Sequence, residues 1–88
     1  MSFEAIKIKD VKETLGEWIK GMRKEKNLSQ DELAIALNLS RITIQNLESG
    51  KNITIDTLLK VLQYFDALDS FHQYISSESQ NNSYKSLY

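Results

Sequence analysis

Two closely spaced helix-start signals constrain the fold of this chain more than any other feature of its sequence. Ser29 is followed three residues later by Glu32, a spacing that predicts a capping box in which each side chain accepts a hydrogen bond from the other residue's backbone N–H. Ser40 stands before a second amphipathic stretch and is a second candidate N-cap. The sequence therefore predicts two short helices joined by a tight turn, the first ending near Asn38 and the second covering residues 41–48.

These two helices have small apolar faces that suit close packing. The faces consist of Leu33, Ala34 and Leu37 in the first helix and of Ile44 and Leu47 in the second. Because Ala34 is small and lies near the middle of its helix, the second helix is able to cross close over the first. Gly50 adopts the left-handed conformation at little cost, so we expect it to end the second helix.

A longer helix is predicted before this pair, over residues 11–26, with Asp10 as its N-cap. Its apolar stripe has helical spacing and consists of Val11, Leu15, Trp18, Ile19 and Met22. We expect Trp18 in the core rather than on the surface as a stacking platform for a base. Gly16 and Gly21 each lower helix propensity by about 1 kcal/mol relative to alanine, so tertiary packing must hold this helix together.

Residues 1–10 form a separate N-terminal segment. Apolar and basic side chains alternate from Ile6 to Lys9, which is the period of a half-buried strand. One short strand is marginal alone and would need a partner, such as the same segment of a second copy. The other interpretation is an extended arm that lays an apolar side chain on the core, so this segment is predicted to be an arm or a short strand.

Two further helices and a polar tail complete the predicted architecture. The fourth helix covers residues 55–65, and a short fifth helix starts at Asp66 or Asp69 and ends at residue 75. Their apolar residues are Leu58, Leu59, Leu62 and Phe65 in the fourth helix and Leu68, Phe71 and Ile75 in the fifth. Residues 76–88 are polar and are expected to form a flexible tail. The predicted fold is all-α, a compact five-helix domain over residues 11–75 with an extended N-terminal arm and a flexible polar C-terminal tail.

The composition excludes several classes of functional site. The 88 residues contain no cysteine and a single histidine, His72, which excludes thiolate and multi-histidine metal sites and cysteine nucleophiles. The chain has no glycine-rich phosphate loop and its acidic pairs lack a pocket, so we expect no cofactor and no enzymatic activity. Its apolar runs are far short of the ~20 residues that cross a bilayer, and its start does not resemble a signal peptide. We therefore expect a cytoplasmic protein that makes no membrane contact.

The charges are unevenly distributed along the chain. The formal net charge is -1, which is unusual for a protein that binds nucleic acid. Residues 1–26 nevertheless carry seven basic and five acidic side chains, whereas residues 52–88 carry two basic and four acidic ones. An anionic partner should therefore approach the N-terminal half of the protein.

The outward face of the predicted helix 41–48 carries side chains that suit base edges. These side chains are Arg41, Ile42, Thr43, Gln45 and Asn46. Arginine pairs with guanine, glutamine and asparagine pair with adenine, and apolar groups contact the thymine methyl group. Ile42 is the ambiguous member, because it either contacts such a methyl group or packs against a neighbouring helix of the chain.

The segment from Leu28 to Gly50 resembles the Cro/C1-type (XRE) helix-turn-helix family of bacterial and phage repressors. The matching residues are Ser29-Gln30-x-x-Leu33-Ala34 and Ser40-x-x-Thr43-Ile44-x-x-Leu47-Glu48-x-Gly50-Lys51. The resemblance covers about residues 14–75 and implies a lambda-repressor-like fold. It also implies that residues 40–48 are a recognition helix for the major groove of double-stranded DNA, and that a homodimer binds a palindromic operator.

The resemblance further implies roles for single residues. Base contacts fall on Arg41, Ile42, Gln45 and Asn46, and contacts to the DNA backbone fall on Gln30, Ser40, Thr43, Lys51 and Asn52. Family members often pair an arginine of the first helix with the glutamate that ends the recognition helix, and the matching residues here are Arg23 and Glu48. Such a pair would orient the recognition helix. The alternative is an exposed ion pair worth ~0–1 kcal/mol.

The last predicted helix is the expected dimer surface, because Leu68, Phe71 and Ile75 are more apolar than a monomer of this size needs. The chain also resembles HipB-type antitoxins, which repress their own operon and hold a HipA-type kinase toxin. The sequence thus predicts a transcriptional repressor that acts as an autoregulating antitoxin. Two alternatives stay open: a stand-alone transcriptional regulator without a toxin partner, and a protein-interaction adaptor that uses Leu87 and Tyr88 of the tail.

Overall fold

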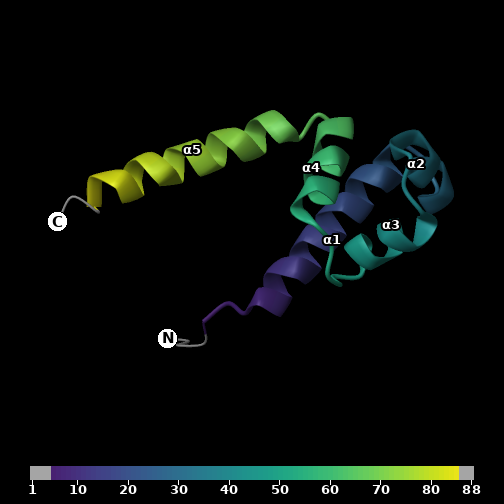
Figure 1. Ribbon diagram of the computed structural model, residues 1–88, viewed down its shortest axis with the longest axis horizontal. Coiled ribbons are helices and arrows are strands. Elements are labelled where there is room, and N and C mark those ends of the chain that lie inside the picture. Colours follow the sequence, from purple (N-terminus) through teal and green to yellow (C-terminus); the bar gives the residue numbers. More distant parts are fainter. Residues whose placement is uncertain (1–4, 86–88) are drawn as a thin grey trace.

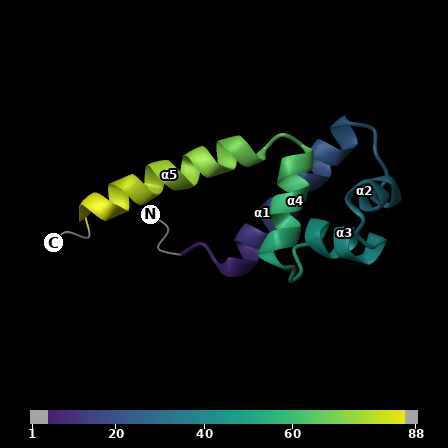
Figure 2. The same cartoon turned by 45° about the horizontal axis from the view of Figure 1, so that its top comes forward.

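A computed structural model describes the backbone of residues 5–85 and the side chains of residues 5–81, and this part of the chain is all-α as predicted (Figure 1). The helices are α1 (Ile8–Glu25), α2 (Gln30–Leu37), α3 (Arg41–Glu48), α4 (Ile55–Tyr64) and α5 (Leu68–Lys85). Helices α1 to α4 pack into a globule, and α5 projects away from it in both ribbon views (Figures 1 and 2). Within the described residues, no helix is long and apolar enough to span a bilayer.

The caps of α2 and α3 confirm the predicted helix pair. The Ser29 hydroxyl accepts a hydrogen bond from the Glu32 N–H at 3.0 Å, and the Glu32 carboxylate accepts one from the Ser29 N–H at 2.7 Å. Asn38 ends α2 in the left-handed conformation, with φ 56°. The Ser40 hydroxyl then accepts a hydrogen bond from the Thr43 N–H at 3.1 Å and begins α3. Local capping chemistry thus fixes both helices and the short turn between them.

The core lies between α1, α2, α3 and α4. Its buried apolar residues are Ile19, Leu33, Ala34, Ile44, Leu47, Val61, Leu62, Phe65 and Ala67. α3 packs against both α1 and α2. Because its inward side chains, such as Ile44 and Leu47, are buried in this core, the position of α3 is fixed from beneath.

Gly16 sets how closely α1 approaches the end of α3. A Cβ atom at this position would clash with the backbone carbonyl oxygen of Glu48 and would lie 2.8 Å from that of Leu47. Glycine at this position lowers helix propensity, but only glycine allows the backbones of α1 and α3 to come this close. Gly21 lies in the same helix, but a Cβ atom there would meet no atom within 4 Å.

α1 begins earlier than the sequence patterns predict. Lys7 is its N-cap, and Asp10 lies inside the first turn, where its carboxylate accepts a hydrogen bond from the Lys7 N–H at 3.0 Å. The prediction of Asp10 as the N-cap was wrong, because this aspartate caps from the third helical position instead. Of the two interpretations of the N-terminal segment, the short strand over Ile6 to Lys9 was wrong, since Ile8 and Lys9 are already helical.

Trp18 is not part of the core, contrary to the prediction. Its side chain is 39% exposed, whereas the adjacent Ile19 is fully buried. Gly16 and Ile19 define the face of α1 that packs against the core, and Trp18 lies beside this face. Trp18 instead lines a surface hollow with Val11 and Leu15.

α5 is much longer than the predicted fifth helix. Asp66 is left-handed, with φ 57°, and α5 begins after Ala67 and continues to Lys85. Residues 76–85 are therefore helical, and the prediction of a flexible tail was wrong for them. This stretch contains neither glycine nor proline. Side-chain hydrogen bonds from Gln73 to Asp69 and from Tyr74 to Glu78, each one turn apart, support the helix. The predicted anchors Leu87 and Tyr88 lie outside the described residues.

The contrast between the two glycines of α1 gives a test of the α1–α3 contact. We expect Gly16→Ala to lower the free energy of unfolding by about 1–3 kcal/mol, because the added methyl group overpacks a contact between backbones. Gly21→Ala is the matched control and should raise the free energy of unfolding by roughly 0.5–1 kcal/mol, since it only improves helix propensity. Urea unfolding followed by circular dichroism measures both values. Equal effects of the two substitutions would contradict the close approach.

Candidate nucleic-acid interface

α3 presents a polar face to solvent while its opposite face is buried. Arg41, Ile42 and Gln45 are exposed, and Asn46 is half-buried. Ile44 and Leu47 point into the core on the other side of the helix. The four side chains expected to contact bases therefore lie on a helix that the core holds rigidly and leaves accessible.

Ile42 lies on the exposed face of α3 and is not buried by any other part of the described chain. Its side chain is 66% exposed, so the interpretation that it packs against a neighbouring helix of the same chain was wrong. An isoleucine this exposed between polar side chains suits an apolar contact with another molecule. Its predicted contact with a thymine methyl group stays a prediction.

The end of α3 is held by a buried ion pair. The Arg23 guanidinium donates two hydrogen bonds to the Glu48 carboxylate, from Nε at 2.6 Å and from Nη2 at 2.9 Å. Its third nitrogen, Nη1, donates to the Leu28 carbonyl at 2.7 Å, and the Gln30 amide donates to Glu48 at 3.1 Å. Arg23 and Glu48 are only 7% and 9% exposed, so the alternative of an exposed ion pair was wrong. The cluster ties α1, the start of α2 and the end of α3 together.

The Glu48 carboxylate is more acidic than an ordinary glutamate. Burial alone would raise its pKa. The hydrogen bonds from Arg23 and Gln30, together with the positive charges of Arg23 and Lys20, outweigh burial and lower the pKa below its ordinary value. The same hydrogen bond with Glu48 raises the pKa of Arg23. Both groups are therefore ionised in the folded protein at neutral pH.

Arg41 lies at the exposed start of α3 and forms an ion pair with Asp31. Nη1 of Arg41 lies 3.7 Å from the Asp31 carboxylate, and both side chains are more than half exposed. An exposed pair at this distance is worth ~0–1 kcal/mol, so Arg41 exchanges partners at little cost. The acidic residues of α2 do not form a metal site, since no three acidic or histidine side chains among the described residues gather in a way that could hold a metal ion.

Two of the residues expected to contact the DNA backbone bind each other. The hydroxyl groups of Ser40 and Thr43 lie 2.8 Å apart, and the Ser40 hydroxyl also caps α3. Both side chains therefore serve the start of the helix in the free protein. Their hydroxyl groups lie at its exposed N-terminal end, where the helix dipole and the free N–H groups favour an anion.

The other end of α3 borders a polar hollow of about 370 Å³. Its lining residues are Lys20, Gln30, Gln45, Asn46, Glu48, Ser49 and Lys51. The structure thus brings Gln30, Gln45 and Lys51 together, although α2, α3 and the loop after α3 supply them separately. Asn52 lies apart from this group, and its side-chain oxygen accepts a hydrogen bond from Lys12 of α1.

Lys20 is a residue of this site that the sequence analysis missed. It lies on α1, one turn before Arg23, and adds a positive charge beside the Glu48 carboxylate and Lys51. Its position one turn from Arg23 was the available signal, because residues spaced three or four apart share one face of a helix. Lys20 and Lys51 provide two cations next to the exposed end of α3.

Comparison with known proteins agrees with this geometry. The sequence profile of the helix-turn-helix family matches residues 19–69, which is more than half of the chain. The chain therefore belongs to the helix-turn-helix family, of the Cro/C1 type that its motifs resemble.

Two relatives carry the same domain. A protein of Methanocella arvoryzae, named as an HTH-type transcriptional regulatory protein, is 48% identical over 52 residues. A protein of Methanosphaerula palustris with the same name is 35% identical over 52 residues. These alignments cover 59% of this chain but only 16% and 17% of the relatives, so the chain spans about one sixth of their length.

The buried ion pair gives a test of how α3 is held. We expect Glu48→Gln to lower the free energy of unfolding by about 3 kcal/mol, because it leaves the Arg23 guanidinium buried without its counter-charge. Glu17→Gln removes an exposed carboxylate of α1 and is the matched control, with an expected effect within about 0.5 kcal/mol. Chemical denaturation measures both. A loss below 1 kcal/mol for Glu48→Gln would contradict a structural role for the pair.

The pH dependence of stability gives an independent test of the same pair. Because the pKa of Glu48 is lower in the folded protein than in the unfolded chain, its contribution is complete above the ordinary glutamate pKa of about 4.3 and is lost as the pH falls through the folded value. The difference in unfolding free energy between wild type and Glu48→Gln should therefore be constant near neutral pH and shrink below about pH 4.3. A difference that stays constant down to pH 2 would show that the ionised carboxylate does not matter.

Proposed function

We propose that this protein is a sequence-specific DNA-binding transcriptional regulator that reads the major groove with α3. The observation that carries the proposal is the exposed face of Arg41, Ile42, Gln45 and Asn46 on a helix held from beneath by the core and at its end by Arg23 and Glu48. Membership of the helix-turn-helix family and the names of the two relatives support it. They equally favour a non-enzymatic protein.

The surroundings of α3 support a docking geometry on DNA. Gln30 at the start of α2 and Lys51 after α3 border the same hollow as Gln45. Contacts to phosphates on either side of a groove fix the register of a protein on DNA, whereas base contacts read the sequence. We therefore assign backbone contacts to Gln30, Lys20 and Lys51, and base contacts to the face of α3. Ser40 and Thr43 at the start of α3 and Asn52 in the loop after α3 complete the proposed backbone contacts.

The protein is proposed to bind a palindromic operator as a homodimer. Two recognition helices that lie about 34 Å apart reach successive major grooves on one side of the duplex. The proposed dimer residues are Leu68 and Phe71, which are half-buried against the core, and Ile75, which is exposed. These residues lie in the first half of α5, which packs against α4, and not on α3.

We propose repression as the mode of regulation. A regulator of its own operon, bound over the promoter, represses by excluding the transcription machinery. The same α3 surface serves a stand-alone regulator and a HipB-type antitoxin, which differ in whether a HipA-type kinase toxin binds the protein. Co-purification with the product of the neighbouring gene distinguishes the antitoxin from the stand-alone regulator.

Base reading by α3 is tested with fluorescence anisotropy on the duplex immediately upstream of the gene, against a scrambled duplex at physiological salt. Arg41→Ala and Gln45→Ala should each weaken binding to the upstream duplex by ~1–3 kcal/mol and leave binding to the scrambled duplex nearly unchanged. Ile35→Ala alters an exposed residue of α2 and is the control. If each variant weakened binding to both duplexes equally, α3 would not read the sequence.

Phosphate binding is tested through the salt dependence of affinity. Lys51→Ala and Lys20→Ala should each weaken binding to all duplexes alike and lower the slope of log affinity against log salt by about 1, because each lysine releases counterions from one phosphate. Lys60→Ala removes a cation of α4 that borders no part of the polar hollow, and should leave the slope unchanged. An unchanged slope for Lys51→Ala would remove this residue from the interface.

A further inference from the structure

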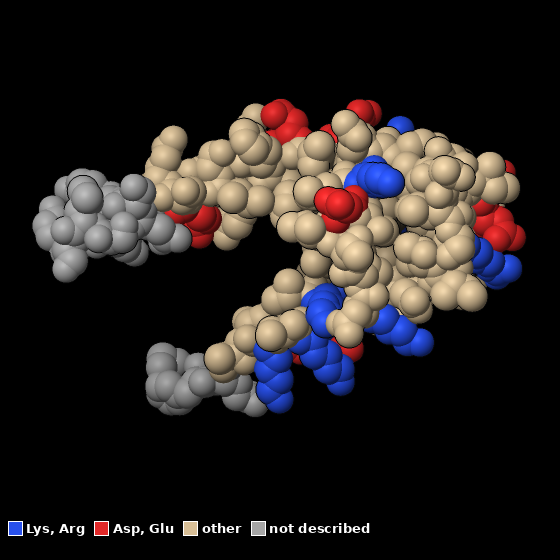
Figure 3. Space-filling model, viewed as in Figure 1, with Lys and Arg blue, Asp and Glu red and all other residues tan. Residues whose placement is uncertain are grey.

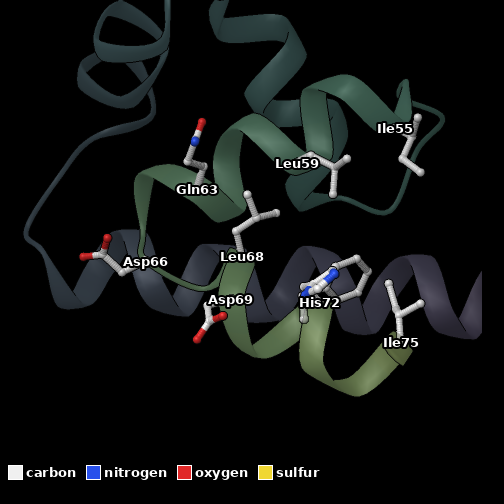
Figure 4. A pocket seen from close by; sticks show the side chains of 9 residues that line it. Ile55, Leu59, Gln63, Asp66, Leu68, Asp69, His72 and Ile75 are labelled. Atoms are coloured by element: carbon white, nitrogen blue, oxygen red, sulfur yellow. The ribbon is translucent and has the colours of Figure 1, made fainter. Parts of the chain in front are cut away.

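Three surface hollows with apolar linings are connected by the residues that they share. The first hollow lies between α4 and α5, has a volume of about 740 Å³ and includes Ile55, Leu59 and Ile75 (Figure 4). The second also includes Ile55 and reaches Leu15 of α1, and the third includes Leu15 and Trp18. Ile55 lines the first two hollows and Leu15 lines the second and third, and we call the three together the apolar tract, whose residues come from α5, α4 and α1.

Several large apolar side chains of this tract are exposed to solvent. Val11, Ile55 and Ile75 are 50%, 68% and 48% exposed, and Trp18 is also exposed. Ile6, which lines the third hollow, is 76% exposed. Contiguous apolar surface of this kind marks a site where another macromolecule docks.

The shape of the molecule indicates what docks there. α5 packs mainly against α4 and then projects from the globule (Figures 1 and 2). The space-filling view shows a hollow between the projecting α5 and the start of α1 (Figure 3). A helix of 18 residues is about 27 Å long and has a width of roughly 10–12 Å. The protein thus has both a projecting helix and an open hollow beside it.

The charges on the two sides of the hollow are complementary. The start of α1 carries Lys7, Lys9 and Lys12 against Asp10 and Glu13, so residues 7–13 have three positive and two negative side chains and a net charge of +1. α5 and its preceding turn carry Asp66, Asp69 and Glu78, and no lysine or arginine lies among residues 66–81. Figure 3 shows the basic side chains along the start of α1 and acidic ones along α5. A second α5 that entered the hollow would bring its acidic side chains to the basic start of α1.

We propose a mutual exchange of contacts between two copies of this chain: each α5 stays on its own α4, and its exposed face lies in the hollow between α1 and α5 of the other copy. The exposed side of the entering helix, with Ile75, covers Val11 and Trp18 of α1 as well as Ile55 of α4. Because each copy gives one helix and receives one, the interface is closed and two-fold symmetric. The proposal rests on the dimer of the proposed function and adds α1 as the surface that receives the partner.

The apolar part of the proposal is tested by sedimentation equilibrium of charge insertions at exposed positions. Val11→Glu on α1 and Ile75→Glu on α5 should each weaken the dimer at least about tenfold, because each buries a charge in the interface. Ile35→Glu places the same charge at an exposed position of α2 and should leave the dimer unchanged. Circular dichroism verifies that all three variants are folded. An unchanged dimer for Val11→Glu would overturn the role of α1, even if Ile75→Glu disrupted it.

The exchange itself is tested by a charge swap between copies. Lys9→Glu alone and Glu78→Lys alone should each weaken the homodimer about three- to tenfold, because each places like charges on the two sides of both symmetric contacts. An equimolar mixture of the two variants should restore dimerisation, since a heterodimer has an opposite-charge pair at both contacts. Glu17→Lys is the control for a charge change elsewhere on α1. Failure of the mixture to form more dimer than either variant alone would overturn the exchange.

The same samples separate this proposal from the proposed function. A wild-type protein that is monomeric at 100 μM would overturn the exchange, while specific binding of that monomer to a half-site would still support reading by α3. A dimer disrupted by Val11→Glu and restored by the charge swap would support the exchange even if the upstream duplex were not bound. Binding of DNA and pairing of the copies thus fail independently.

Discussion

The buried contact between Arg23 and Glu48 is the interaction on which the rest of the candidate interface depends. A guanidinium group has a planar set of donors, and here it uses them on the Glu48 carboxylate and on the Leu28 carbonyl. One side chain of α1 thereby fixes both the loop that leads into α2 and the last residue of α3. Lysine has no such fork of donors and could not hold these three acceptor oxygens in one plane. Burying this ion pair has a desolvation cost, but the pair gives α3 a defined orientation.

Shape and charge at the end of α3 are coupled through Gly16. The absence of a side chain at Gly16 lets the α1 backbone approach the carbonyl groups of Leu47 and Glu48. This approach brings Arg23, two turns further along α1, within reach of the Glu48 carboxylate. Lys20 then lies beside the exposed end of α3 and adds positive charge next to Lys51. The same close packing therefore buries the ion pair and assembles the polar hollow.

The sequence predicts the middle of this fold better than its ends, for physical reasons. α2 and α3 begin at Ser29 and Ser40 because capping is local chemistry that neighbouring residues determine. Trp18 was wrongly predicted in the core, because apolar periodicity does not show which face of α1 packs against α3. Gly16 lies on that face, and Trp18 lies beside it. α5 was cut short because its second half lacks an apolar stripe, although it also lacks the glycine or proline that would end a helix. The contact of Arg23 with Glu48 came from a family resemblance, since residues this far apart share no local signal.

The most direct test of the account is a titration of the isotopically labelled protein with the upstream duplex, followed by backbone amide chemical shifts. If α3 enters the major groove, the largest shift changes should fall on Arg41 to Asn46, with smaller ones at Gln30 and Lys51. The signals of α5 should change little, because the account places that helix at the contact between copies. Large changes confined to α5 or to the start of α1, with α3 unaffected, would contradict the claim that α3 is the surface that reads DNA.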